Sequence, residues 1–356
     1  MRQVFAELAR KMGVILVSMF FAGAYAAPSF AQADLAQPEI HAMEFPFFTL
    51  RNRTGSLEPE KIYGSERSDL KAGLCRVEEL DLGVLSPLAD VAPNFMREEL
   101  LRVEDVREKE SAVILDGLEA TAGARGPALF VHGYYIGFEK GCRRAALLQQ
   151  NADLAGRFLW FSWPSDGSAA YYTHDESDLY WSVPDLADTI IELVRRFGEG
   201  AVDLIGHSLG ARGVVLALYE VANRQPNIEL GHIVLLAPDM DFDIFARMLP
   251  RIEPVAKSIS VYAASGDRPL ALSRQLHGYA RLGQSGNDVS RIPGVEVIDL
   301  SDLPSDGPTG HLYHIYSPDV GADLRQLLNE GKPAETRGGL VAKGANLWHL
   351  KPGARD

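Results

Sequence analysis

Short apolar runs alternate with amphipathic segments along the chain from about residue 128 onward. The runs are mostly apolar rather than alternating, which is typical of strands buried on both faces of a sheet. Predicted strands cover residues 128–131, 158–163, 201–205, 233–236, 259–263 and 295–300. Helical spacing of apolar positions predicts helices over residues 138–154, 184–197, 209–222 and 318–328. This alternation predicts an α/β fold, in which helices cover both faces of a mostly parallel sheet.

The N-terminal residues 1–33 have the pattern of a signal peptide. Three basic residues flank or precede an apolar stretch over residues 13–24, and Ala-Gln-Ala at residues 31–33 offers a cleavage site. The apolar stretch is too short for a comfortable transmembrane helix. An uncleaved anchor or a buried first helix is the alternative. We therefore expect an exported protein, periplasmic or extracellular, with no integral membrane span after cleavage.

The rest of the chain divides by composition into three parts. Residues 34–59 contain three prolines and little periodicity, so they are interpreted as a linker. The regular pattern over residues 60–330 predicts the folded domain. Residues 331–356 are rich in glycine, proline and charge, and are expected to form a loosely attached C-terminal tail.

The charge of the chain argues against two classes of partner, and its cysteines allow one disulfide. The net charge of −13 becomes −15 once the three basic residues and one acidic residue of 1–33 are removed. Such an acidic surface argues against nucleic acid and anionic membranes as partners. Cys75 and Cys142 are the two cysteines. In an oxidising compartment they could form a disulfide between the N-terminal strand region and the helix after Gly133; two unpaired buried thiols are the alternative.

A glycine-flanked serine lies between a predicted strand and a predicted helix. Residues 206–210 read Gly-His-Ser-Leu-Gly, with Ser208 at the centre. This strand–turn–helix context is that of a nucleophile elbow, in which a sharp turn presents the serine at the carboxyl end of the strand. The alternative is a glycine-rich turn in which Ser208 only caps the helix.

A serine nucleophile needs a base and an acid, which in this fold follow it in the order acid, then histidine. For the base, His311 and His314 both lie in a loop between the last predicted strand and the last helix, and we favour His311. For the acid, we favour Asp267, which follows the strand over 259–263, over Asp239, which follows the preceding strand.

The oxyanion hole requires two backbone N–H donors, for which we predict Leu209, directly after the serine, and Tyr134, in the loop after the strand over 128–131. Residues 164–183, with two adjacent tyrosines, are expected to form either a wall over an apolar pocket or a solvent-facing loop. No nucleotide, metal or other cofactor motif is visible. The acidic run at 239–243 lacks the glycine and glutamate of a calcium loop.

Several motifs together resemble a bacterial α/β-hydrolase family, the domain of unknown function number nine hundred. The matching segments are IYGSER at 62–67, LFVHGY at 129–134, FSWPSDGS at 161–168, GHSLGAR at 206–212, LLAPDMDFDIF at 235–245, VYAASGD at 261–267 and GHLYH at 310–314. The resemblance implies the α/β-hydrolase fold over about residues 60–330 and a triad of Ser208, Asp267 and His311. Tyr135 stands where an asparagine is expected after His-Gly-Tyr.

The residues therefore predict a serine hydrolase that acts on a small-molecule or lipid ester. An acyltransferase or an amidase with the same triad is an alternative, which product analysis would separate. A non-catalytic binding protein on a hydrolase fold is a third reading, because fold does not imply function. A complete set of serine, acid and histidine in the right order argues against that third reading.

Overall fold

The computed structural model describes residues 42–80, 94–304 and 309–353, and it groups residues 40–356 into one unit. The predicted signal peptide, residues 1–33, lies outside the described part. Within it, eleven strands form one sheet in the order β10-β11-β9-β8-β7-β6-β4-β5-β1-β2-β3. Their bounds are β1 Ala42–Arg53, β2 Tyr63–Glu79, β3 Leu101–Lys109, β4 Ala128–Val131, β5 Phe158–Ser162, β6 Asp203–His207, β7 Leu230–Leu236, β8 Ala256–Ala263, β9 Val295–Asp299, β10 Leu340–Ala342 and β11 Leu347–Leu350.

Most of the sheet is parallel. Strands β4 to β9 pair with their neighbours in parallel, and so do β1 with β5 and β11 with β9. Only the outer pairs β1–β2, β2–β3 and β10–β11 are antiparallel. Because parallel strands end at the same edge, the loops after β1, β4, β5, β6, β7 and β8 meet there, where open α/β sheets carry their sites.

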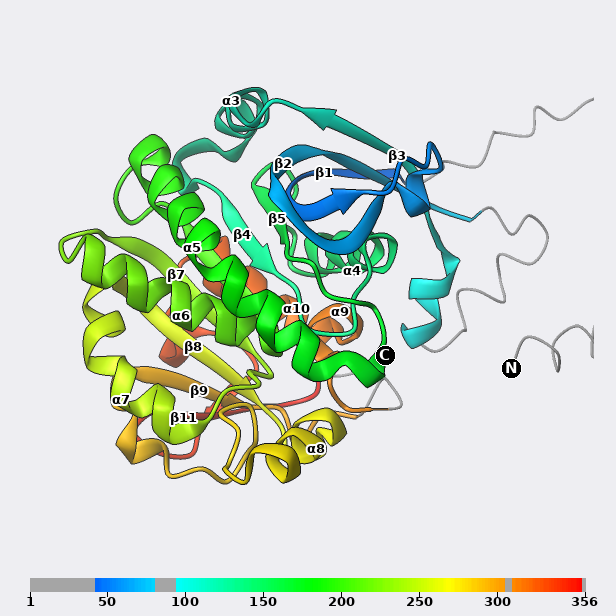
Figure 1. Cartoon of the computed structure of the whole chain (residues 1–356). Coiled ribbons are helices and arrows are strands. Elements are labelled where there is room, and N and C mark those ends of the chain that lie inside the picture. The colour runs from blue at the N-terminus through cyan, green and yellow to red at the C-terminus, as the bar shows by residue number, and fades with distance from the viewer. Residues whose placement is uncertain (1–41, 81–93, 305–308, 354–356) are drawn as a thin grey trace, which may run out of the picture. The chain divides into compact units, whose positions relative to one another are not determined.

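Helices cover both faces, as Figure 1 shows. One apolar core lies under α5, α6 and α7, and a second lies under α4 and α10 on the opposite face. The helices are α3 Ser111–Ala122, α4 Phe138–Asn151, α5 Tyr172–Phe197, α6 Leu209–Arg224, α7 Phe242–Ile252, α8 Arg268–His277, α9 Tyr313–Tyr316 and α10 Pro318–Leu328. The architecture is the α/β-hydrolase fold and confirms the predicted fold class.

The interpretation of residues 34–59 as a linker is wrong for the described residues from 42 onward. Strand β1 lies inside the sheet between β2 and β5, and its side chains at Phe45, Phe47 and Leu50 are buried. Two features explain why the sequence pattern did not indicate this strand. Burial of both faces removes the apolar–polar alternation, and Pro46 within the run argues against a strand.

Residues 331–353 are not a loose tail. Strand β11 pairs with β9, and β10 pairs with β11, which extends the sheet. Arg337 is 3% exposed and lies between the last helix and the sheet. Helix α5 also differs from prediction, because it begins at Tyr172 and contains Pro184 instead of starting there.

A disulfide joins the antiparallel strands to the rest of the domain. It links Cys75 on β2 to Cys142 on α4, with the two Cα atoms 6.5 Å apart. Both cysteines are fully buried. The two cysteines are 67 positions apart in the sequence, so the disulfide links the N-terminal strands to the helix that follows the loop after β4.

Candidate active site

Ser208 has an unusual backbone conformation at the turn between β6 and α6. Its φ of 54° and ψ of −120° lie in a region that L-residues rarely occupy, and such strain tends to occur at functional sites. Hydrogen bonds to β7 and the loop after it help to hold this conformation, from Ser208 N to Leu236 O (2.9 Å) and from Asp239 N to Ser208 O (3.0 Å). A Cβ on Gly206 would lie 2.5 Å from the Ala211 Cα atom, so the tight turn requires glycine there.

His311 and Asp267 form a buried pair at the same sheet edge. The distance from His311 Nδ1 to Asp267 Oδ2 is 2.6 Å, and the other carboxylate oxygen accepts the Leu270 amide N–H at 2.9 Å. Gly310, at φ +63°, lets the loop that carries His311 pack closely against the loop that carries Asp267, because a Cβ at residue 310 would lie 2.8 Å from Gly266 O. The acid therefore holds the imidazole with Nε2 turned away from itself, as a general base requires.

The loop that carries His311 also contacts His207, the residue before Ser208. His207 Nε2 lies 3.1 Å from His311 O, and the two rings are 4.6 Å apart. Among the described residues, no hydrogen bond joins Ser208 Oγ to His311. Contacts of this kind are often long without substrate and tighten when it binds.

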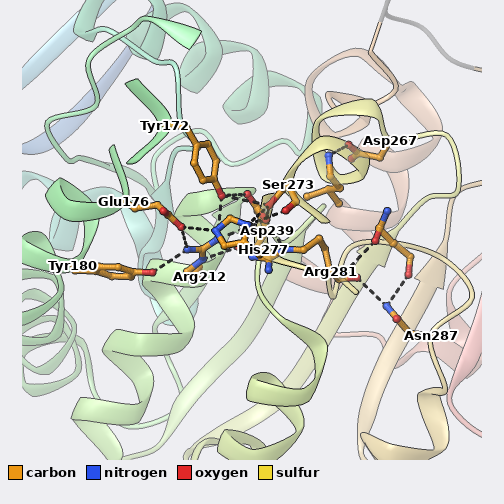
Figure 2. Close-up of polar contacts among 12 residues, drawn as sticks. Tyr172, Glu176, Tyr180, Arg212, Asp239, Asp267, Ser273, His277, Arg281 and Asn287 are labelled. Atoms are coloured by element: carbon orange, nitrogen blue, oxygen red, sulfur yellow. Dashed lines mark hydrogen bonds and ion pairs between the residues drawn. The ribbon is translucent and has the colours of Figure 1, made fainter. Parts of the chain in front are cut away.

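Asp239, the alternative acid, is engaged elsewhere (Figure 2). Its Oδ1 accepts hydrogen bonds from Ser273 (2.6 Å) and Arg281 (2.7 Å), and its Oδ2 accepts one from Tyr172 (2.5 Å). Although burial raises the pKa of Asp239, the charges of Arg212 and Arg281 outweigh it and keep the pKa below its usual range. Asp239 therefore fastens α5 and the α8 region to the turn that carries Ser208.

The loop after β4 lies directly against Ser208. A Cβ on Gly133 would come within 3.0 Å of Ser208 Cβ and 2.9 Å of His207 Nδ1. Tyr134 follows, and its ring packs edge-on against Tyr172 with centroids 5.1 Å apart. Leu209 is the first residue of α6, where helix N–H groups have no partner within the helix. The two predicted donors thus come from segments that meet at Ser208.

Tyr135 adopts the left-handed conformation, at φ +65°. Asparagine tolerates this region better than tyrosine does, which gives a physical reason to expect asparagine at this position. The Tyr135 side chain is 41% exposed, while its backbone N–H donates to Asp175 (3.0 Å). Asp175 was missed in the sequence because its partners are mainly backbone groups, which leave no pattern of residue types.

The segment over 164–183, for which a wall and a solvent-facing loop were both open, is mainly the start of α5. Tyr172 packs against Tyr134 in the loop after β4, whereas Tyr180 is 48% exposed and Trp181 37% exposed. Of the aromatic residues in this segment, Tyr172 is thus the one placed to form a wall of the site.

Three buried histidines lie in or around the turn that carries Ser208. Burial lowers the pKa of His132 to about 3, and burial together with the neighbouring histidines lowers the pKa values of His207 and His314 well below their usual range. His314 is 3% exposed, and its ring is tilted by 33° against that of His207, with the centroids 4.1 Å apart, so it packs against the turn that carries Ser208. His132 stacks on Trp163, with ring centroids 5.0 Å apart.

These histidines predict a loss of stability in mild acid. In the unfolded chain each has a pKa of about 6.5. Below that pH the unfolded state takes up protons that the folded state does not, so the free energy of unfolding falls as pH falls. The three together should lower it by about 2 kcal/mol between pH 7 and pH 6. Urea denaturation at the two pH values measures this. A His174→Ala variant, whose side chain is 71% exposed, should show the same difference. Equal stability at both pH values would contradict the prediction.

A comparison with models of known protein families identifies the family of the chain. The model of the family described as "Alpha/beta hydrolase of unknown function (DUF900)" matches residues 116–330. The chain belongs to this family. The match confirms the resemblance that the motifs indicated, and it leaves β1, β2, β3 and the last two strands outside its bounds. No curated protein matches the chain.

Three solved structures similar to this DUF900 member are described as hydrolases and have low sequence identity to it. A predicted CIB-like hydrolase from Thermoplasma acidophilum is 19% identical, with 59% of this chain and 89% of that chain covered and a TM-score of 0.35. A hormone-sensitive lipase from a metagenome library is 14% identical, covering 69% and 95%, with a TM-score of 0.38. An esterase from Pyrobaculum calidifontis is 13% identical, covering 73% and 80%, with a TM-score of 0.35.

Within residues 42–80, 94–304 and 309–353, no group of three or more His, Cys, Asp or Glu side chains is arranged to hold a metal ion. In the same residues no helix is both long and apolar enough to cross a bilayer.

Proposed function

We propose that this DUF900 hydrolase is a serine hydrolase that cleaves carboxylic esters through an acyl-enzyme on Ser208. The observation that supports it most is the meeting of three features at one sheet edge. These are the strained Ser208 backbone, the 2.6 Å pair of His311 and Asp267, and the β4 loop against the serine. The first and second supply an activated nucleophile, and the third supplies the donors that acyl transfer needs.

In the proposed reaction, His311 Nε2 takes the proton of Ser208 as Oγ attacks the ester carbonyl carbon. The oxyanion that forms accepts hydrogen bonds from the backbone N–H groups of Leu209 and Tyr134. Collapse breaks the bond to the alcohol oxygen, which receives the proton from His311 and leaves. Water, deprotonated by His311, then attacks the acyl-enzyme, and breaking the bond to Ser208 Oγ returns the proton to the serine.

Labelling with a fluorophosphonate probe tests this proposal. We expect wild-type protein to be labelled to about one probe per chain, with labelling abolished in Ser208→Ala and slowed about 1000-fold or more in His311→Ala. A Ser273→Ala variant is the matched control, because Ser273 is a buried serine bonded to Asp239. Its labelling should persist. Folded wild-type protein that stays unlabelled and hydrolyses no p-nitrophenyl ester would contradict the proposal.

A further inference from the structure

Arg51 is a fully buried arginine whose partners lie at the active-site edge. It is on β1, and because β1 runs parallel to β5, its end reaches the same edge as the catalytic loops. Its Nη2 donates to Ile136 O (2.6 Å) and its Nε to Ser162 Oγ (2.9 Å). Its Nη1 donates to Gly64 O (3.1 Å) and Ser165 O (2.9 Å). The guanidinium thus ties the β4 loop to the loop after β5.

Asp175 completes the contacts from the other side. Its Oδ2 accepts the Tyr135 N–H (3.0 Å) and the Ser165 hydroxyl (2.5 Å), and its Oδ1 accepts the Asp166 N–H (2.8 Å). Ser165 Oγ in turn accepts the Ile136 N–H at 3.0 Å. Like Arg51, both Asp175 and Ser165 have no exposed surface.

We propose that Arg51, Ser165 and Asp175 are positioning residues that hold the β4 loop so that the Tyr134 N–H points at the developing oxyanion. The inference rests on the proposed function, and it assigns to strand β1 a role in catalysis. Residues 135 and 136 follow that donor directly, and their two N–H groups and one carbonyl are bound by these three side chains.

Two physical arguments support a role beyond stabilising the fold. Tyr135 at φ +65° is costly for a tyrosine, so the loop keeps this shape only where its surroundings impose it. Burying a guanidinium is also costly, and burial lowers the pKa of Arg51 to about 9 against the opposing charge of Asp175. The charge nevertheless remains at neutral pH, and its shortest bond is made to the β4 loop. Preorganised donors are what an oxyanion hole requires.

The test compares Arg51→Met with Arg157→Met. Arg157 is a second buried arginine, which donates to Gly126 O and Leu328 O and pairs with Asp203. It precedes β5, at the opposite end of the strands from Ser208. Both variants should lose stability, but Arg51→Met alone should lose catalytic rate. We expect kcat per labelled serine to fall about 10- to 100-fold with KM changed less than about twofold. For Arg157→Met we expect wild-type kcat.

Asp175→Asn provides a second variant in case Arg51→Met does not fold. Asparagine has one acceptor oxygen, so its NH2 group must face either the Tyr135 N–H or the Asp166 N–H. We again expect kcat to fall about 10-fold or more at unchanged KM, with faster amide hydrogen exchange in a peptide covering residues 132–138. If the wild-type protein is labelled but Arg51→Met or Asp175→Asn keeps the wild-type kcat, this inference is overturned and the proposed function stands. Wild type that neither labels nor hydrolyses ester would overturn the proposed function and, with it, this inference.

Discussion

Replacement of Asp267 by asparagine is expected to lower kcat for ester hydrolysis about 1000- to 10,000-fold, while KM changes little. Asp267 uses one oxygen for His311 Nδ1–H and the other for the Leu270 amide. Asparagine keeps one acceptor. If that oxygen faces Leu270, the NH2 group faces His311 and stabilises the tautomer with the proton on Nε2, which cannot accept the proton of Ser208.

The contrasting variant is Asp239→Asn, because Asp239 was the other candidate acid. It should destabilise the protein, since it weakens the bonds to Arg281, Ser273 and Tyr172. For the folded fraction, we expect kcat to fall less than about 10-fold. Steady-state kinetics normalised to fluorophosphonate-labelled protein gives both values. The reverse order of the two losses would assign the acid to Asp239 and refute the His311–Asp267 pair as the catalytic one.

Replacement of Arg337 by methionine is expected to lower the free energy of unfolding by about 3–5 kcal/mol. Arg337 donates to Asp323 (3.0 Å), to the Tyr262 hydroxyl (3.1 Å) and to Glu296 (2.6 Å). The side chains of Arg337 and Asp323 have no exposed surface. Without the guanidinium, a buried carboxylate remains uncompensated, which is more costly than losing an exposed ion pair.

Chemical denaturation of wild type and variant at pH 7 measures this loss. Arg325→Met, an exposed change on α10, should alter stability by less than about 0.5 kcal/mol. Burial raises the pKa of Asp323, and Arg337 opposes that rise. Removing Arg337 should raise this pKa further, so Asp323 protonates more readily in the variant and the difference from wild type should shrink as pH falls. A loss below about 1 kcal/mol at pH 7 would show that residues 331–353 contribute little.

The sequence predicted the parallel part of the sheet well, for a physical reason. Strands buried on both faces are apolar runs, and the helices between them show an apolar stripe, so both signals are local. Predicted and observed bounds agree for β4 at 128–131 and for α10 at 318–328. The order of serine, acid and histidine likewise indicated residues that the structure brings to one edge. It left two acids open, and the two differ in their contacts: Asp267 pairs with His311, whereas Asp239 binds Ser273, Arg281 and Tyr172.

The remaining features depend on contacts that residue types do not reveal. Strand β2 exposes many polar side chains, so its pattern is mixed over its 17 residues. The interactions of Arg51 run mainly to carbonyl oxygens, which every residue carries. Arg337 looked like one more charge in a polar C-terminal segment, yet its partners lie 14 to 75 positions earlier. Burial of a charge is a property of the assembled sheet and is not visible in the segment that supplies it.

Strand β1 has a consequence for the order in which the protein can assemble during synthesis. It is made first among the described strands, but its parallel neighbour β5 begins at residue 158, and β11, near the other end, ends at residue 350. During synthesis the chain therefore holds an apolar β1 that has no parallel partner until β5 has been made, and the sheet of the described residues is complete only once β11 has been made. Folding of this kind, which relies on distant pairings, is slow and exposes strand edges to aggregation.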